Sequence, residues 1–118
     1  MSFLKSLSTF LATKYGKVTG GKYAGASLGL GNDSQKVVEV NPVFTQLLFI
    51  EGTKEIARVP VSEVASYEIV LENIAGMALK LNWKSGGESM IKIDKLDRQG
   101  KKLAYDPVGK VLGALSNK

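Results

Sequence analysis

The sequence contains no cysteine and no histidine among its 118 residues. Without these side chains the chain cannot form a disulfide, a thiol nucleophile, a histidine-based catalytic triad or the usual Cys/His zinc site. It also lacks any apolar run of the roughly 18–20 residues that a membrane-spanning helix needs. We therefore expect a protein without a cofactor or a resident metal, and we expect that it is not an enzyme.

Acidic residues are missing from the beginning of the chain, where Asp33 is the first. The same stretch contains four lysines that could bind an anion, namely Lys5, Lys14, Lys17 and Lys22. The net charge of +5 and the apolar content of 44% are ordinary for a soluble globular protein. The first residues do not resemble a signal peptide, because Lys5 and several hydroxyl side chains interrupt the apolar stretch. We therefore expect a cytoplasmic protein.

Residues 3–14 have the spacing of a short amphipathic helix that Gly16 would end. Its apolar face would consist of Phe3, Leu4, Leu7, Phe10 and Leu11. An apolar face beside basic residues is typical of a helix that lies on a membrane surface. We favour the simpler interpretation that this face packs on the domain's own sheet, and a third possibility is docking against a partner or a second copy. The expected organisation is thus a helical segment at 1–16 and a single domain at 17–118.

Beyond this helix the sequence predicts a turn or linker at 17–21 and then a series of short strands separated by turns. The expected strands cover 23–30, 36–40, 44–50, 55–59, 66–72, 77–84 and 89–94, with one helical turn at 62–64. The clearest alternation is that of Met77, Leu79, Leu81 and Trp83, which predicts one buried and one wet face. Residues 66–72 also alternate, with Tyr67, Ile69 and Leu71 expected on one side.

The chain ends in a second predicted helix that Asp106 caps and that Pro107 begins. Its apolar stripe would consist of Val108, Val111, Leu112 and Leu115. Gly109 and Gly113 lie inside it, each at a cost of about 1 kcal/mol relative to alanine, which close packing on a sheet or a partner could offset. Together these patterns predict a mainly β fold with flanking helices: a barrel or sandwich of about seven antiparallel strands, capped by the C-terminal helix.

The order of these elements resembles that of the pleckstrin-homology superfold. The segment at 56–67, Ile-Ala-Arg-Val-Pro-Val-Ser-Glu-Val-Ala-Ser-Tyr, is similar to the strand, Ile-Pro-hydroxyl-x-aliphatic, strand pattern of bacterial PH-like and GRAM-like domains. The resemblance implies a seven-stranded barrel with a C-terminal helix, in which this segment crosses between two sheets. The chain departs from the eukaryotic pattern in two ways. Its only tryptophan, Trp83, is on a strand instead of the last helix, and the hairpin at 31–36 carries one acidic and one basic residue where phosphoinositide-binding domains carry a group of basic residues.

Two patterns that could carry chemistry have simpler explanations. Gly25, Gly29 and Gly31 do not stand between a strand and a helix, as a dinucleotide-binding loop requires. Asp94 and Asp97, with Asp106 beyond them, have basic neighbours that would lower their pKa values, which is the wrong direction for a general acid. We interpret this region as a solvated charged loop.

The sequence therefore predicts a non-catalytic interaction module. It would bind a protein or peptide partner, or associate with itself as a homo-oligomer, through an exposed sheet edge or the N-terminal helix. The alternative is peripheral binding to an anionic lipid surface through that helix and its lysines. Nucleic-acid binding, suggested by Tyr15 and Tyr23 among the lysines, is a second alternative that we disfavour because the central strands carry many glutamates.

Overall fold

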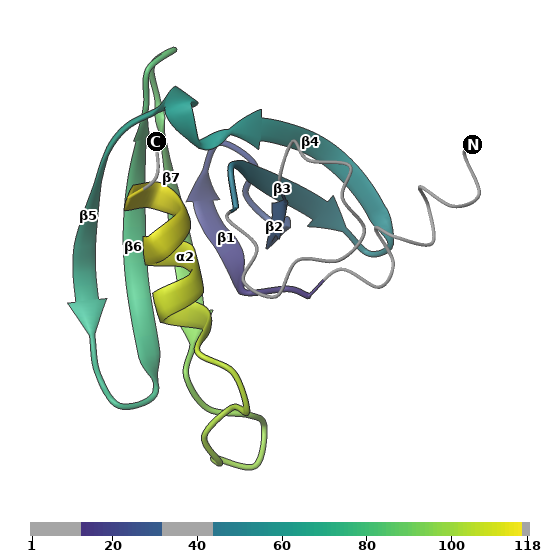
Figure 1. Ribbon diagram of the computed structural model, residues 1–118, viewed down its shortest axis with the longest axis vertical. Helices are drawn as coiled ribbons and strands as arrows, with labels where there is room; N and C mark the ends of the chain where they lie inside the picture. The colour runs from purple at the N-terminus through teal and green to yellow at the C-terminus, as the bar shows by residue number, and fades with distance from the viewer. Residues whose placement is uncertain (1–12, 32–43, 117–118) are drawn as a thin grey trace.

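The computed structural model describes residues 13–31 and 44–116, and within them seven strands form one antiparallel sheet (Figure 1). The order of the strands in the sheet is β4-β3-β2-β1-β7-β6-β5. The strands are β1 (Gly16–Gly21), β2 (Ser27–Gly31), β3 (Gln46–Glu51), β4 (Lys54–Pro60), β5 (Val64–Glu72), β6 (Gly76–Trp83) and β7 (Glu88–Asp94). A 3-10 turn, η1 (Val61–Glu63), joins β4 to β5, and the helix α2 (Pro107–Ser116) ends the described chain.

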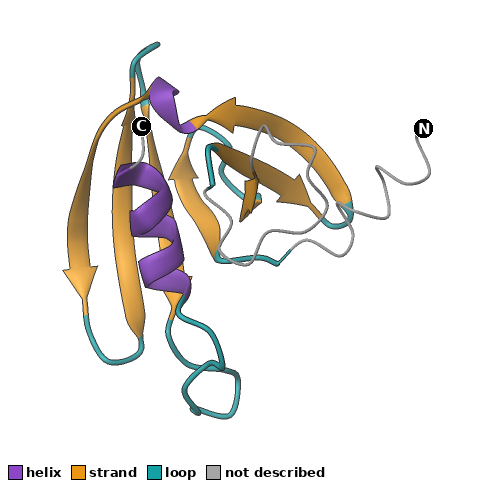
Figure 2. Cartoon of the chain, in the orientation of Figure 1, coloured by secondary structure: helices purple, strands orange, loops and turns teal. Residues whose placement is uncertain are grey.

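The sheet is bent, and η1 connects its two halves (Figure 2). β4, β3, β2 and β1 form one half, β7, β6 and β5 form the other, and α2 lies across the second half. The mainly β fold with a C-terminal helix is therefore confirmed. The expected barrel or sandwich is replaced by one open sheet, in which β4 and β5 are the two edges and no described backbone hydrogen bonds pair them.

The first strand is where the sequence interpretation was wrong. Residues 17–21 were expected to form a turn or linker, but they belong to β1, which pairs with both β2 and β7 at the centre of the sheet. The glycines of this segment made it resemble a linker, and they also allow the close approach of strands that the structure shows. A Cβ atom on Gly16 would lie 2.9 Å from the carbonyl oxygen of Lys92, and one on Gly21, where φ is 75°, would collide with the carbonyl oxygen of Glu88. Glycine therefore lets β1 approach β7 closely.

The next segments also differ from expectation. The strand expected at 23–30 begins only at Ser27, because the preceding residues form a turn in which Tyr23 has a φ of 68°. The strand expected at 36–40 lies outside the described residues. The N-terminal helix is not supported: Thr13 and Lys14, the described part of the expected range, are not helical, and the rest lies outside the described residues. Within the described ranges, no helix is long and apolar enough to cross a bilayer.

The core lies between the bent sheet and α2. The four alternating residues of β6 are buried, as the pattern predicted, and Trp83 is the most accessible of them at 5%. The expected helical stripe is also confirmed: Val108, Val111 and Leu115 are buried in the same cluster, and Leu112 is partly buried against it. The Asp106 carboxylate accepts a hydrogen bond from the Gly109 backbone N–H at 2.9 Å, which confirms the expected cap.

The two helix glycines have different surroundings. A Cβ atom on Gly109 would collide with the capping carboxylate of Asp106, whereas a Cβ atom on Gly113 would meet nothing within 4 Å. The capping contact with Asp106 therefore requires glycine at position 109. No contact in the described chain requires glycine at position 113.

We predict that Gly113→Ala raises the free energy of unfolding by about 1 kcal/mol, because alanine has the higher helix propensity. Gly109→Ala, the matched substitution in the same helix, should lower it by about 1 kcal/mol through loss of the cap. Urea denaturation followed by circular dichroism measures both. A destabilising Gly113→Ala would contradict the open space that the structure shows at this position.

A buried hydrogen-bonded chain ties the β1–β2 turn to β6 and β7. The indole N–H of Trp83 donates to Ser89 Oγ at 2.8 Å, and this hydroxyl donates to the carbonyl oxygen of Lys22 at 2.6 Å. Ser89 is fully buried. Because water cannot replace a partner there, the hydroxyl of Ser89 satisfies two polar groups at once.

We predict that Ser89→Ala destabilises the fold by about 1–3 kcal/mol, since it leaves the buried indole N–H and the Lys22 carbonyl without a partner. The fluorescence of Trp83, the single tryptophan, reports unfolding directly. The control is Ser85→Ala in the neighbouring turn, where the hydroxyl accepts only an exposed contact from Lys22 Nζ at 3.5 Å. Equal effects of the two substitutions would mean that the buried chain adds nothing to stability.

Candidate interaction surface

The two edges of the open sheet differ in how they are protected. β4 carries Lys54, the exposed side chain of Arg58 and a terminal Pro60, which has no N–H to offer a further strand. Arg58 is held by Glu55, with 2.6 Å between its Nε and the Glu55 carboxylate, and the pairing of β4 with β3 is irregular between Ala57 and Glu55. Lysine, proline and a bulge are the usual devices that prevent a sheet edge from adding another strand.

β5, the opposite edge, lacks the lysine and the proline, although its pairing with β6 is also irregular between Val64 and Ser66 and between Ile69 and Leu71. It is the longest described strand, with nine residues, and it contains no lysine, arginine, proline or glycine. In the described chain, residues 66–72 make backbone hydrogen bonds to no element other than β6. In an antiparallel pair, every second residue of an edge strand directs its N–H and C=O away from its partner. Among the described residues, no backbone group pairs with this side of β5 at 66–72.

The end of β5 and the turn after it expose four large aliphatic side chains, which we call the apolar knob: Ile69, Val70, Leu71 and Ile74. Their exposed fractions are 46%, 55%, 59% and 86%. Isolated exposed aliphatic residues are common, but here four of the six residues at 69–74 are large, aliphatic and exposed, and such a concentration is typical of an interaction site.

A bulge places the knob on both sides of the strand. The register pairs Ile69 with the buried Leu79 but Leu71 with Ala78, with an irregularity between them. Because successive residues of β6 face opposite sides of the sheet, Ile69 and Leu71 also lie on opposite faces. The expectation that Tyr67, Ile69 and Leu71 share one face is therefore wrong for Leu71, and its physical reason is the bulge.

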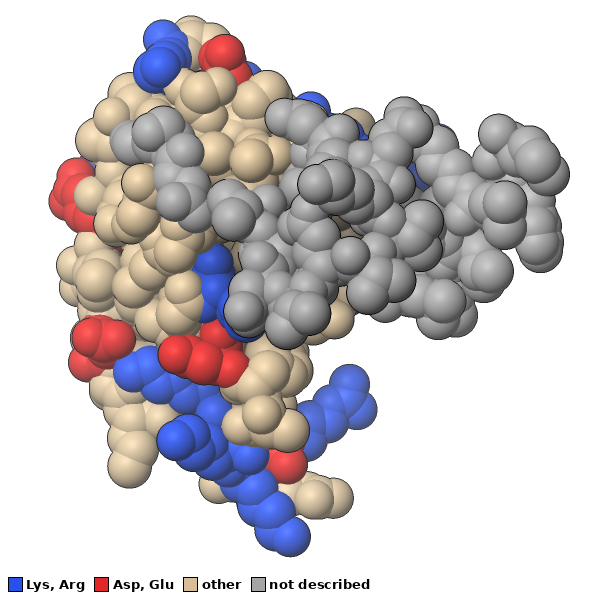
Figure 3. Space-filling model, in the orientation of Figure 1, with Lys and Arg blue, Asp and Glu red and all other residues tan. Residues whose placement is uncertain are grey.

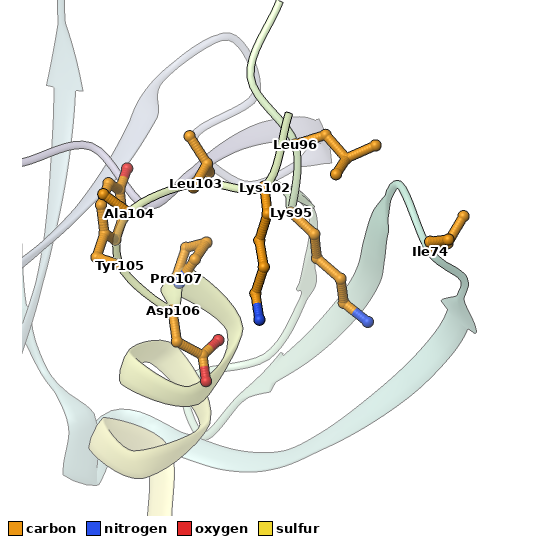
Figure 4. A pocket seen from close by; sticks show the side chains of 9 residues that line it. All are labelled: Ile74, Lys95, Leu96, Lys102, Leu103, Ala104, Tyr105, Asp106 and Pro107. Carbon is orange, nitrogen blue, oxygen red and sulfur yellow. The ribbon is translucent and has the colours of Figure 1, made fainter. Parts of the chain in front are cut away.

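Beside the knob lies a hollow of about 710 Å³ between the β5–β6 turn and the start of α2. Ile74 borders it on one side, and Leu103 and Pro107 line it with other apolar atoms. Lys95 and Lys102 extend side by side into the same space (Figure 4). The surface therefore combines the projecting apolar knob with a neighbouring hollow, which is lined by apolar atoms and by the two lysines.

The charges around the knob are nearly balanced. Glu72 pairs with Lys95 at 3.2 Å, and Lys80 lies between Glu88 at 3.2 Å and Glu68 at 3.7 Å. The pKa of Lys80 is raised, first by its hydrogen bond to Glu88 and then by the charges of both glutamates. Acidic and basic side chains accordingly lie next to each other at this end of the molecule (Figure 3).

The residues that the sequence singled out are placed elsewhere. Phe3, Leu4, Lys5, Leu7, Phe10 and Leu11 lie outside the described residues. Lys14 donates to the carbonyl oxygen of Gly52 at 3.0 Å, whereas Lys22 lies near Ser85 and over the rings of Tyr23 and Trp83. Lys17, on β1, is paired in register with Lys92 of β7. The structure therefore does not gather the described lysines at one place, since the roughly 20 Å of β1 separates Lys14 from Lys22.

Two of the three carboxylates considered for chemistry, Asp97 and Asp106, have local backbone partners. Asp97 accepts hydrogen bonds from the backbone N–H groups of Gln99 at 2.8 Å and Lys101 at 2.9 Å, and Asp106 caps α2. These contacts form the loop after β7 and the start of the helix. Over residues 13–31 and 44–116, no three acidic side chains are arranged so that they could hold a metal ion.

Sequence reasoning did not identify the knob. The available signal was the run Ile69-Val70-Leu71, in which three aliphatic residues follow one another and so cannot all face the core of an alternating strand. Comparison with known proteins adds no further assignment, because no protein-family model, curated protein or solved structure matches the chain.

Proposed function

We propose that the protein is a non-catalytic interaction module that binds another protein surface through the apolar knob and the adjoining edge of β5. The observation that carries this proposal is the exposure of four large aliphatic side chains at one end of an edge strand that contains no lysine, arginine or proline. An exposed edge offers backbone hydrogen bonds and the knob offers apolar area, which are the two elements of strand-addition binding.

The fold supports the same proposal. Seven antiparallel strands and one C-terminal helix are among the features that the resemblance to PH-like domains implied, whereas the sheet is open and not the implied barrel. Such a module carries its function on surface edges and loops instead of a catalytic centre. Membership of that family, and a cytoplasmic location, remain predictions.

The proposal can be tested by placing a photo-crosslinking amino acid at Leu71 in the full-length chain and irradiating the cells that express it naturally. We expect a discrete crosslinked product that is lost when Ile69 and Ile74 are both changed to serine. Ile56 provides the matched control, because it is an exposed isoleucine, at 40%, on the opposite edge strand. The absence of any product at Leu71, or the same products at Ile56, would refute the proposed surface.

Anionic-membrane binding through the N-terminal segment remains the alternative prediction. Its five apolar residues and Lys5 lie outside the described residues, and Lys14, Lys17 and Lys22 do not form one basic face. The described structure therefore favours the β5 surface as the site.

A further inference from the structure

We propose that the occupant of this surface is a second copy of the same chain, related by a two-fold axis that passes beside Leu71. This inference rests on the proposed function, because it names the partner of that same surface. Two-fold pairs are the commonest oligomers of soluble proteins, and they require a patch that is complementary to itself.

The shape of the patch meets this requirement. A stable interface buries about 800 Å² on each partner, which is more than a knob of four side chains supplies, so the neighbouring hollow must also be covered. The knob and the hollow lie side by side on one copy and share Ile74. A two-fold axis near Leu71 would bring the Leu71 side chains of the two copies together and would place Ile74 of each copy against the hollow of the other, so both apolar parts are buried together.

The charges of the patch are also self-complementary. Lys80 is shared by Glu68 and Glu88, which leaves one negative charge unbalanced near the strand. On the other side of Ile74, Lys102 makes no ion pair with any described residue. The same rotation that exchanges knob and hollow would bring Lys102 of one copy toward Glu68 of the other. An acidic partner would instead need a basic patch, and this end of the molecule carries both signs.

Sedimentation equilibrium of the purified full-length protein, over a wide concentration range at low salt, tests the inference. We expect a species of twice the 12.7 kDa chain mass. Leu71→Ser and Ile74→Ser should each weaken dimerisation by at least about tenfold, because each removes a buried aliphatic side chain from the interface. Ile56→Ser on the other edge should leave the dimer unchanged.

A charge exchange tests the proposed orientation independently of the apolar contacts. Lys102→Glu and Glu68→Lys should each weaken dimerisation by a few-fold, and the double variant should restore it, because the exchanged pair again has opposite signs. Far-UV circular dichroism of each variant verifies that these exposed substitutions leave the fold intact. Failure of the double variant to recover would overturn the assigned orientation.

The absence of cysteine allows a covalent version of the same test. Leu71→Cys introduces the only thiol in the chain, and mild oxidation should link two copies because a residue beside the axis meets its own counterpart. Ile56→Cys should link far more slowly.

A protein that stays monomeric at all concentrations, or a dimer that Leu71→Ser does not weaken, would overturn the proposal. In that case a crosslink from Leu71 to a different protein would show that the proposed surface stands but its occupant is not a second copy. With neither a dimer nor any crosslink, the proposed function would fail as well.

Discussion

An open sheet has two edge strands, and each has one side on which no neighbouring strand pairs with its backbone N–H and C=O groups. The rest of this molecule depends on how the chain protects those two edges. β4 is closed to further pairing by lysine, arginine and a terminal proline. β5 has none of these, and its two glutamates are directed into ion pairs with Lys80 and Lys95. Exposing apolar side chains on such an edge costs solubility. The asymmetry between the edges is therefore the observation from which the proposed interaction surface is argued.

Close backbone approach at the centre of the sheet makes the open arrangement possible. Gly16 and Gly21 let β1 lie near β7, and the hydrogen bonds from Trp83 through Ser89 to Lys22 fasten the turn after β1 to β6 and β7. β1 therefore joins the two halves of the sheet by ladder hydrogen bonds, and η1 joins them again through the chain. With the halves held together from within, the outer side of β5 is not needed to close the structure.

The sequence was a good guide wherever a residue's role is set by its own neighbours. The alternation of β6, the capping of α2 by Asp106 and the helical turn at η1 could all be predicted. It was a poor guide wherever the role is set by a distant segment. The glycines of β1 resemble a linker until β7 is seen beside them, and the last residues of β5 resemble an alternating strand until the bulge against β6 turns Leu71 away from Ile69. The count of seven strands agreed with expectation although its members differ, because β1 was missed and the strand expected at 36–40 lies outside the described residues.

The same distinction explains why the candidate site differs from the one that the sequence favoured. Charge and helical periodicity directed attention to the N-terminal segment, since both can be read from consecutive residues. The knob has no comparable signature, because Ile69, Val70 and Leu71 would be ordinary core residues if another strand followed β5 in the sheet. Their exposure is a consequence of strand order alone. An aliphatic run that is suited to a sheet interior but placed at its edge is what a strand completed by a second molecule requires, and this is why the topology, more than the composition, favours an interaction protein.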